Sequence, residues 1–142
     1  MVRAKMIAEV LGGRSVLRKC VSSIEELDAA VTFGLPKKSL RLTVERVALP
    51  GDIRQTMARI VPAATFKRRQ RLSPAESAKT ERLARVIASA EHTWNDKADA
   101  RKWMTKPHPE LGNKTPLDTS MSELGARRVE ALLEKLFYGI PA

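Results

Sequence analysis

The sequence predicts an all-α fold. Apolar residues recur every three or four positions in most segments, and period-two alternation is almost absent, which is the pattern of amphipathic helices rather than strands. Eight prolines divide the 142 residues into short segments, and a chain of this length forms one domain or two very small ones. We expect an N-terminal helical segment over 1–35, a helix-turn-helix-like region over 36–72 and a small helical domain over 73–142.

Two helices are predicted in the N-terminal segment, residues 1–35. The first covers residues 4–11 and stops at Gly12-Gly13, while residues 15–21 are compatible with a helix or with a short strand. Ser22 or Ser23 caps the next helix, and Glu25 or Glu26 three residues later completes a capping box. We expect that helix to end near Gly34 and to bury Ile24, Leu27, Ala30 and Val31.

Three short helices are predicted over residues 37–48, 51–60 and 63–71. Their apolar positions suit small helices around a common core: Leu40, Leu42, Val44 and Val47; Ile53, Met57 and Ile60; Ala64 and Phe66. The last two helices are joined by a turn of a few residues, as in a helix-turn-helix. Phe66 is expected to face inward while the cations that follow it stay in water.

The strongest helix start in the chain is at Ser73. Ser73 is the expected N-cap, Pro74 occupies the first helical position, and Glu76 closes a capping box. The long helix runs to about Thr93 and buries Leu83, Val86, Ile87, Ala90 and Trp94. Asn95 or Asp96 caps a shorter helix with Ala100, Trp103 and Met104 inside.

A loop and a final helix are predicted from residue 106 onward. Residues 106–119 hold three prolines and read as a loop, with one helical turn expected at most, after Pro116. The last helix begins near Ser122 and is ended by Gly139. Its apolar stripe comprises Leu124, Val129, Leu132, Leu133, Leu136 and Phe137.

Composition narrows the class of function. No hydrophobic run is long enough to span a membrane, and the lone Cys20 fits a protein of the reducing cytoplasm. Neither His92 nor His108 has metal-ligand spacing, and no phosphate-loop, dinucleotide-binding or GxSxG motif occurs. We therefore expect no catalytic residues, no bound metal and no cofactor.

The net charge of +10 is unevenly distributed along the chain. Residues 1–72 carry 15 basic and 6 acidic side chains, whereas residues 73–142 carry 11 basic and 10 acidic side chains.

The excess of positive charge in residues 1–72 predicts a DNA-binding surface. Its candidate residues are Thr65, Lys67, Arg68, Arg69 and Arg71. Such a cluster neutralises phosphates and releases counterions. The first residues of this helix, Pro62-Ala63-Ala64, cannot hydrogen-bond to base edges, and Thr65, Lys67 and Arg68 are the first that could. We therefore expect strong backbone contact and modest direct readout, with specificity from dimer spacing or DNA shape. The alternative is an ordinary solvated helix face.

The carboxyl end is the second candidate surface. Most of the Leu and Val stripe of the last helix is expected to be core. The tail Tyr138-Gly139-Ile140-Pro141-Ala142 either frays, as termini usually do, or docks into a cleft of a partner where its carboxylate pairs with an arginine.

Residues from Leu72 onward resemble the toxin-binding domain of the Xre/MbcA/ParS antitoxin family. The similar stretches are LSPAESAKTERLARVIASAEHTW, DARKWMTKPHPELGNKTPLD and ELGARRVEALLEKLFYGIPA, and Gly34-Leu35-Pro36 and residues 65–69 resemble the family's helix-turn-helix portion. The chain departs from the family at Pro62 and Ala64, where the recognition helix often has a polar cap and an arginine.

That resemblance implies an antitoxin that binds a RES-domain toxin, a fold related to ADP-ribosyl-transferring enzymes that consumes NAD. It implies that the antitoxin covers the toxin's active-site entrance, forms a homodimer or larger complex with it, and represses its own operon by binding operator DNA. The toxin contacts it implies are Gly125, Arg128, Leu132, Leu136, Tyr138, Gly139, Ile140, Pro141 and Ala142. The rival hypotheses are a stand-alone helix-turn-helix regulator and a structural protein that binds DNA without sequence preference.

Overall fold

The computed structural model describes residues 2–139. Within them it contains ten α-helices, two short 3₁₀ helices and no strands, which confirms the all-α prediction. The helices are α1 (Ala4–Val10), α2 (Gly13–Leu17), α3 (Ile24–Phe33), α4 (Lys37–Val47), η1 (Pro50–Asp52), α5 (Ile53–Ile60), α6 (Ala63–Arg68), α7 (Pro74–Trp94), α8 (Lys97–Met104), η2 (Pro109–Leu111), α9 (Pro116–Thr119) and α10 (Glu123–Phe137).

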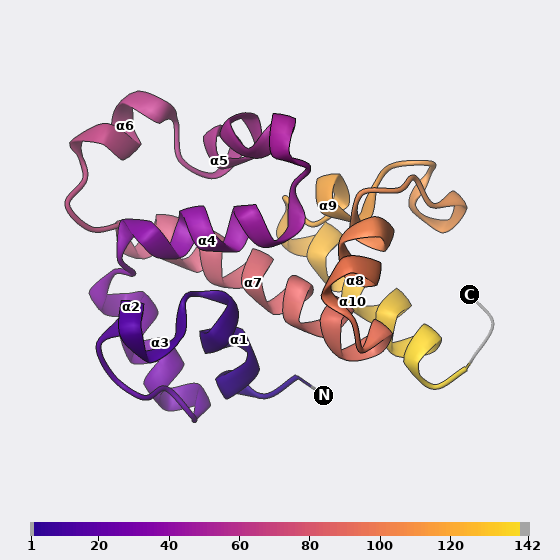
Figure 1. The fold of residues 1–142 in the computed structure, drawn as a ribbon, viewed down its shortest axis with the longest axis horizontal. Helices are drawn as coiled ribbons and strands as arrows, with labels where there is room; N and C mark the ends of the chain where they lie inside the picture. Colours follow the sequence, from indigo (N-terminus) through magenta and orange to yellow (C-terminus); the bar gives the residue numbers. More distant parts are fainter. Residues whose placement is uncertain (1, 140–142) are drawn as a thin grey trace.

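The long helix α7 lies at the centre of the fold (Figure 1) and packs against α1, α3, α4, α8 and α10. It begins as predicted: the Ser73 hydroxyl accepts a hydrogen bond from the Glu76 amide at 3.1 Å, and the Glu76 carboxylate accepts one from the Ser73 amide at 2.8 Å. Two backbone amides at the start of the helix, which have no carbonyl partner within it, are thereby hydrogen-bonded. This stabilises the helix by about 1 kcal/mol.

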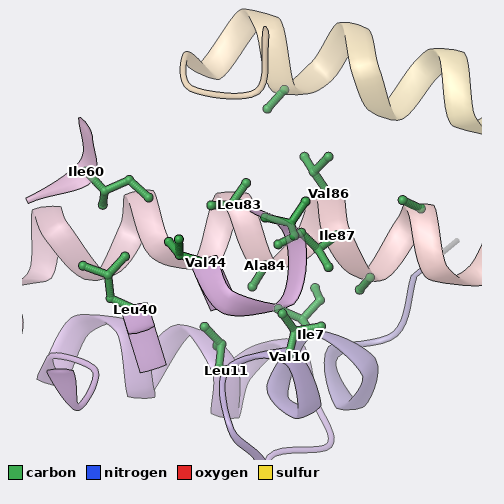
Figure 2. Close-up of a cluster of buried hydrophobic side chains, with 14 of the residues drawn as sticks. Ile7, Val10, Leu11, Leu40, Val44, Ile60, Leu83, Ala84, Val86 and Ile87 are labelled. Carbon is green, nitrogen blue, oxygen red and sulfur yellow. The ribbon is translucent and has the colours of Figure 1, made fainter. Parts of the chain in front are cut away.

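One hydrophobic cluster extends from Ala4 in α1 to Leu133 in α10. Figure 2 shows Leu83 and Val86 of α7 on the side of α10, and Ile7 and Val10 of α1 on the opposite side. Each fully buried Leu, Ile or Val contributes roughly 1.5–3 kcal/mol relative to exposure. Segments from all three predicted regions therefore share one core, built around α7.

Helices α7 and α10 run parallel to each other. Arg82 pairs with Glu123, Arg85 with Glu130, and His92 stacks on Phe137, so contacts advance in the same direction along both helices. Parallel packing brings the C-terminal ends of the two helices together, and a surface composed of both ends results.

The ambiguous residues 15–21 do not form a strand. Gly13–Leu17 is a short helix, α2, which starts directly after α1 because Gly12 has a φ of 116°, a left-handed conformation that favours glycine. Ser23 caps α3 by accepting from the Glu26 amide at 3.1 Å, and the Glu26 carboxylate accepts from the Ser22 amide at 3.0 Å. The reciprocal bond thus comes from the residue before the cap.

Five residues that the sequence predicted to be buried are exposed, and one of them is Ala64 in the first turn of α6. For the other four, the exposed fractions are 63% for Ile24, 39% for Trp94, 69% for Leu124 and 41% for Phe137. Ile24 and Leu124 lie in the first turn of their helices, and Trp94 and Phe137 are the last helical residues. Helix ends extend beyond the core, so a periodic pattern that is correct in the middle of a helix fails at its ends.

Helix α6 ends at Arg68, three residues earlier than expected. Residues 69–72 instead leave the helix and run back to α4, where the Leu72 amide donates to the Leu35 carbonyl at 2.9 Å and Arg71 forms an isolated bridge with Pro36. Leu72 and Leu35 are both fully buried, and burying them stabilises the fold more than a further turn of α6 would. Across the described part of the chain, no helix combines the length and apolarity needed to cross a membrane.

Candidate functional site

The predicted helix-turn-helix pair consists of α5 and α6. Helix α5 buries Thr56, Met57 and Ile60, and Val61 in the turn is 1% exposed. Helix α6 has no buried residue and lies at the outer edge of the molecule, beyond the N-terminal end of α4 (Figure 1). It is held by the partly buried Phe66, whose ring lies under the Lys37 ammonium at 4.5 Å from the ring centroid.

The five predicted DNA-binding residues divide into two groups. Thr65 is half-buried, and Lys67 and Arg68 are exposed in the last turn of α6 with no ion pair to another described residue. Arg69 and Arg71 lie beyond the helix. Arg69 forms a bidentate pair with Glu76, with Nη2 to Oε2 at 3.1 Å, and Arg71 donates to the Gly34 carbonyl at 2.7 Å while lying over the Phe33 ring.

Glu76 links this segment to the start of α7. Its partial burial raises the pKa of the carboxyl, but hydrogen bonds from the Ser73 amide and the Arg69 guanidinium lower it by more, so the pKa of Glu76 lies below its ordinary value. The carboxylate therefore stays ionised at neutral pH and holds Arg69 against the first turn of α7.

The surroundings of Lys67 and Arg68 are almost without acidic residues. Residues 53–75 contain six cations and no Asp or Glu, and residues 29–44 contain Lys37, Lys38 and Arg41 and likewise no acid. The contact between Lys37 and Phe66 brings the second stretch next to the first. Arg59 pairs with Asp118 and Arg69 with Glu76, but Lys38, Arg41, Lys67 and Arg68 have no ion pair with a described residue. The positive charge of these four residues is therefore not neutralised by neighbouring side chains, and a polyanion is the partner that such a field attracts.

A second surface lies where α7 and α10 end together. The His92 ring stacks on the Phe137 ring with centroids 4.7 Å apart, and Tyr138 packs edge-on against Phe137 at 5.1 Å. We call these three residues the aromatic end. Phe137 is 41% exposed and Tyr138 63% exposed. Exposed aromatic groups with a polar tip are enriched at protein interfaces, so this surface is suited to binding another protein.

The predicted toxin contacts on α10 do not share one face. Gly125 and Leu132 are buried inside the chain and Leu136 is half-buried, whereas Arg128, Tyr138 and Gly139 are exposed. Ile140, Pro141 and Ala142 lie outside the described residues. His92 was not identified from the sequence, because its position beside Phe137 depends on the parallel packing of two helices 45 residues apart in the chain.

Ion pairs fix the register of the two helices below the aromatic end. Arg85 of α7 reaches Glu130 of α10 at 3.1 Å, and Arg82 reaches Glu123 at 3.7 Å. Within α7, Arg85 also pairs with Glu81 at 3.2 Å. Burial raises the pKa of Glu81, although its pairing with Arg85 opposes that shift. In residues 2–139 no three His, Cys, Asp or Glu side chains form a group that could hold a metal ion.

Comparison with known proteins places this geometry in context. Residues 89–139 match the model of the antitoxin Xre/MbcA/ParS C-terminal toxin-binding domain. Over 119 residues, 80% of this chain and 72% of the relative, the sequence is 29% identical to Antitoxin Xre of Pseudomonas putida. The matched region includes the end of α7 and all of α10, and with them the aromatic end. Both comparisons are with antitoxins: residues 89–139 are similar to a toxin-binding domain, and a longer stretch of the chain is similar to Antitoxin Xre.

Proposed function

We propose that this chain neutralises a cognate RES-domain toxin by covering the entrance to its NAD-consuming active site, and that it represses its own operon by binding operator DNA. Neutralisation is assigned to the aromatic end together with the tail that follows it. DNA binding is assigned to the exposed cations of α6. The antitoxin acts by occupying space, with no chemical step of its own, and we propose that it does so as a homodimer within a larger complex with the toxin.

The observation that carries the toxin-binding part is the exposure of Phe137 and Tyr138 within the matched region. Their side chains are large and mostly apolar, and they lie where α10 ends. Exposed aromatic residues at the centre of a protein interface contribute about 2 kcal/mol or more each to binding. The partner is thus expected to present a pocket wide enough for aromatic rings.

Co-expression with the product of the neighbouring gene tests this part. The wild-type chain is expected to co-purify with that product and to suppress its consumption of NAD. The double variant Phe137→Ala/Tyr138→Ala, and separately a deletion of residues 140–142, are expected to weaken the complex and to restore NAD loss.

Phe33→Ala is the matched control, because Phe33 is 73% exposed on α3 and lies outside the matched region. Full neutralisation by the Phe137→Ala/Tyr138→Ala variant would remove the aromatic end from the mechanism. The absence of any complex with the wild-type chain would contradict the toxin partner itself and favour a stand-alone regulator.

The DNA-binding part is supported by the unpaired charges of Lys67 and Arg68. Replacing both with Ala is expected to lower affinity for the chain's own promoter, and to reduce the slope of log affinity against log salt by about 2, since roughly one counterion is released per phosphate contact. Competition with unrelated DNA tests the rival hypothesis: equal affinity for both would indicate a structural protein without sequence preference. If the Lys67→Ala/Arg68→Ala variant keeps its affinity for DNA, the exposed side of α6 is an ordinary solvated helix face.

A further inference from the structure

We propose that nucleic acid is held between two helices rather than by α6 alone, and that Lys38 and Arg41 of α4 supply half of the phosphate contacts. We call Lys38, Arg41, Lys67 and Arg68 the basic cradle. The inference rests on the proposed DNA binding and adds to it a second group of contacts, on a helix of the predicted helix-turn-helix-like region for which the sequence identified no contact residues.

One side-chain contact joins α4 to α6, and two hydrogen bonds join the segments that flank them. The Lys37 ammonium lies 4.5 Å from the centroid of the Phe66 ring. The Leu72 amide donates to the Leu35 carbonyl at 2.9 Å, and Arg71 reaches the Gly34 carbonyl at 2.7 Å. The chain before α4 and the chain after α6 are therefore joined, and Lys37 connects the first turn of α4 to Phe66 of α6.

Helical spacing determines which α4 side chains lie on the side of the helix that contacts α6. The core face of α4 is formed by Ser39, Leu40, Thr43, Val44 and Val47, all of which are buried. Arg41 follows Lys37 by four residues, so it lies on the same side of the helix as the residue that contacts Phe66. Lys38 is three residues before Arg41 and is exposed with it on the solvent face.

The charges of these residues are available to a ligand. None of the four cations of the basic cradle forms an ion pair with a residue in the described range. The first turn of α4 has no acidic residue, and Lys37 and Lys38 lie at its positive dipole end. Such an arrangement repels itself in the free protein, and an anion between the helices relieves that repulsion.

Four cations on two neighbouring helices fit a ligand with several regularly spaced negative charges, which is the phosphate backbone of a nucleic acid. Because α6 begins with residues that cannot hydrogen-bond to bases, phosphate contacts carry most of the affinity, and a second helix is needed to fix the orientation of the protein on the duplex. In this arrangement Lys38 and Arg41 contact the backbone and read no sequence.

The test is DNA binding by the full chain with a double-stranded fragment of its own promoter, measured at several salt concentrations. Lys38→Ala/Arg41→Ala is expected to lower affinity about tenfold near 0.15 M salt, and to reduce the salt slope by about 2, as each lost phosphate contact removes roughly 0.9 of a released ion. Lys97→Ala/Lys102→Ala on α8 removes two other exposed cations and is the matched control, for which no change beyond about twofold is expected.

The outcomes separate the inference from the function on which it depends. If Lys67→Ala/Arg68→Ala weakens binding while Lys38→Ala/Arg41→Ala behaves like the α8 control, the basic cradle is wrong and DNA binding by α6 remains. If the α8 control weakens binding equally, net charge rather than a located surface explains the affinity, and the cradle is also wrong. If the wild-type chain binds no DNA, the proposed repression fails. Melting curves of each variant establish that the exposed substitutions leave the fold intact.

Discussion

Arg46 of α4 and Glu91 of α7 form a bidentate ion pair, with Nε to Oε2 and Nη2 to Oε1 both at 2.7 Å. The hydrogen bonds to Glu91 raise the pKa of Arg46 above its ordinary value, although burial opposes that shift. The pair joins the helix that carries half of the basic cradle to the residue next to His92 of the aromatic end. The two proposed binding surfaces therefore rest on elements that are directly bonded.

Removing the charge of Glu91 is expected to destabilise the fold. In Glu91→Gln, the partly buried Arg46 keeps its charge without a compensating carboxylate, so the free energy of unfolding is expected to fall by about 1–2 kcal/mol. Urea unfolding measures this loss, and Glu45→Gln, at an exposed carboxylate on α4, is expected to change stability by less than about 0.5 kcal/mol. A double-mutant cycle with Arg46→Met that returns a coupling energy near zero would show that the pair contributes nothing.

The helix starts were the most predictable part of this structure. Ser73, Asp96 and Ser122 each accept a hydrogen bond from an amide three residues later. The sequence predicted the Ser73 cap outright, offered Asp96 as one of two candidates with Asn95, and placed the start of the last helix near Ser122. A cap is a local interaction between residues three apart, so its signal is contained in a short stretch of sequence. The helical class followed from the same kind of local pattern.

The candidate surfaces depended on information that the sequence does not hold locally. The exposure of Lys67 and Arg68 could be expected from helix spacing. The pairing of Arg69 with Glu76, the contact of Lys37 with Phe66 and the stacking of His92 on Phe137 all require the chain to fold back on itself. Tertiary packing also explains why α6 stops early, since burial of Leu72 against the chain before α4 outweighs the helix propensity of residues 69–71.

Acid is expected to weaken the start of α7 through Glu76. Its folded-state pKa is lower than in the unfolded chain, so the stabilisation is complete above the unfolded value and is lost as the pH falls through the folded value. Glu76→Gln retains an acceptor for the Ser73 amide but has no charge to lose. Wild type is therefore expected to be more stable than the variant at pH 6–7, with the difference shrinking from about pH 5 downward.

Thermal unfolding followed by circular dichroism between about pH 3 and 7 measures this difference. Glu25→Gln is the control, because Glu25 is an exposed carboxylate in the first turn of α3 that has no hydrogen-bonded partner among the described residues. A gap between wild type and Glu76→Gln that stays constant with pH would mean that the effect comes from shape and not from charge.

Gly125 offers a test that separates a structural role from a contact with the toxin. A Cβ at this position would overlap the Thr119 carbonyl oxygen and approach the Ser122 hydroxyl to 2.8 Å, because α10 begins directly against the end of α9. Gly125→Ala must push backbone against backbone, which is expected to cost about 1–3 kcal/mol of stability. Gly51→Ala is the matched control, since nothing lies within 4 Å of the Cβ that it adds.

Well below its melting temperature, Gly125→Ala is expected to bind the toxin as tightly as wild type does, because the buried glycine presents no surface to a partner. Binding measured by titration calorimetry on samples that circular dichroism shows to be folded provides that comparison. A folded Gly125→Ala variant that fails to bind would mean that the start of α10, and not its aromatic end, meets the toxin.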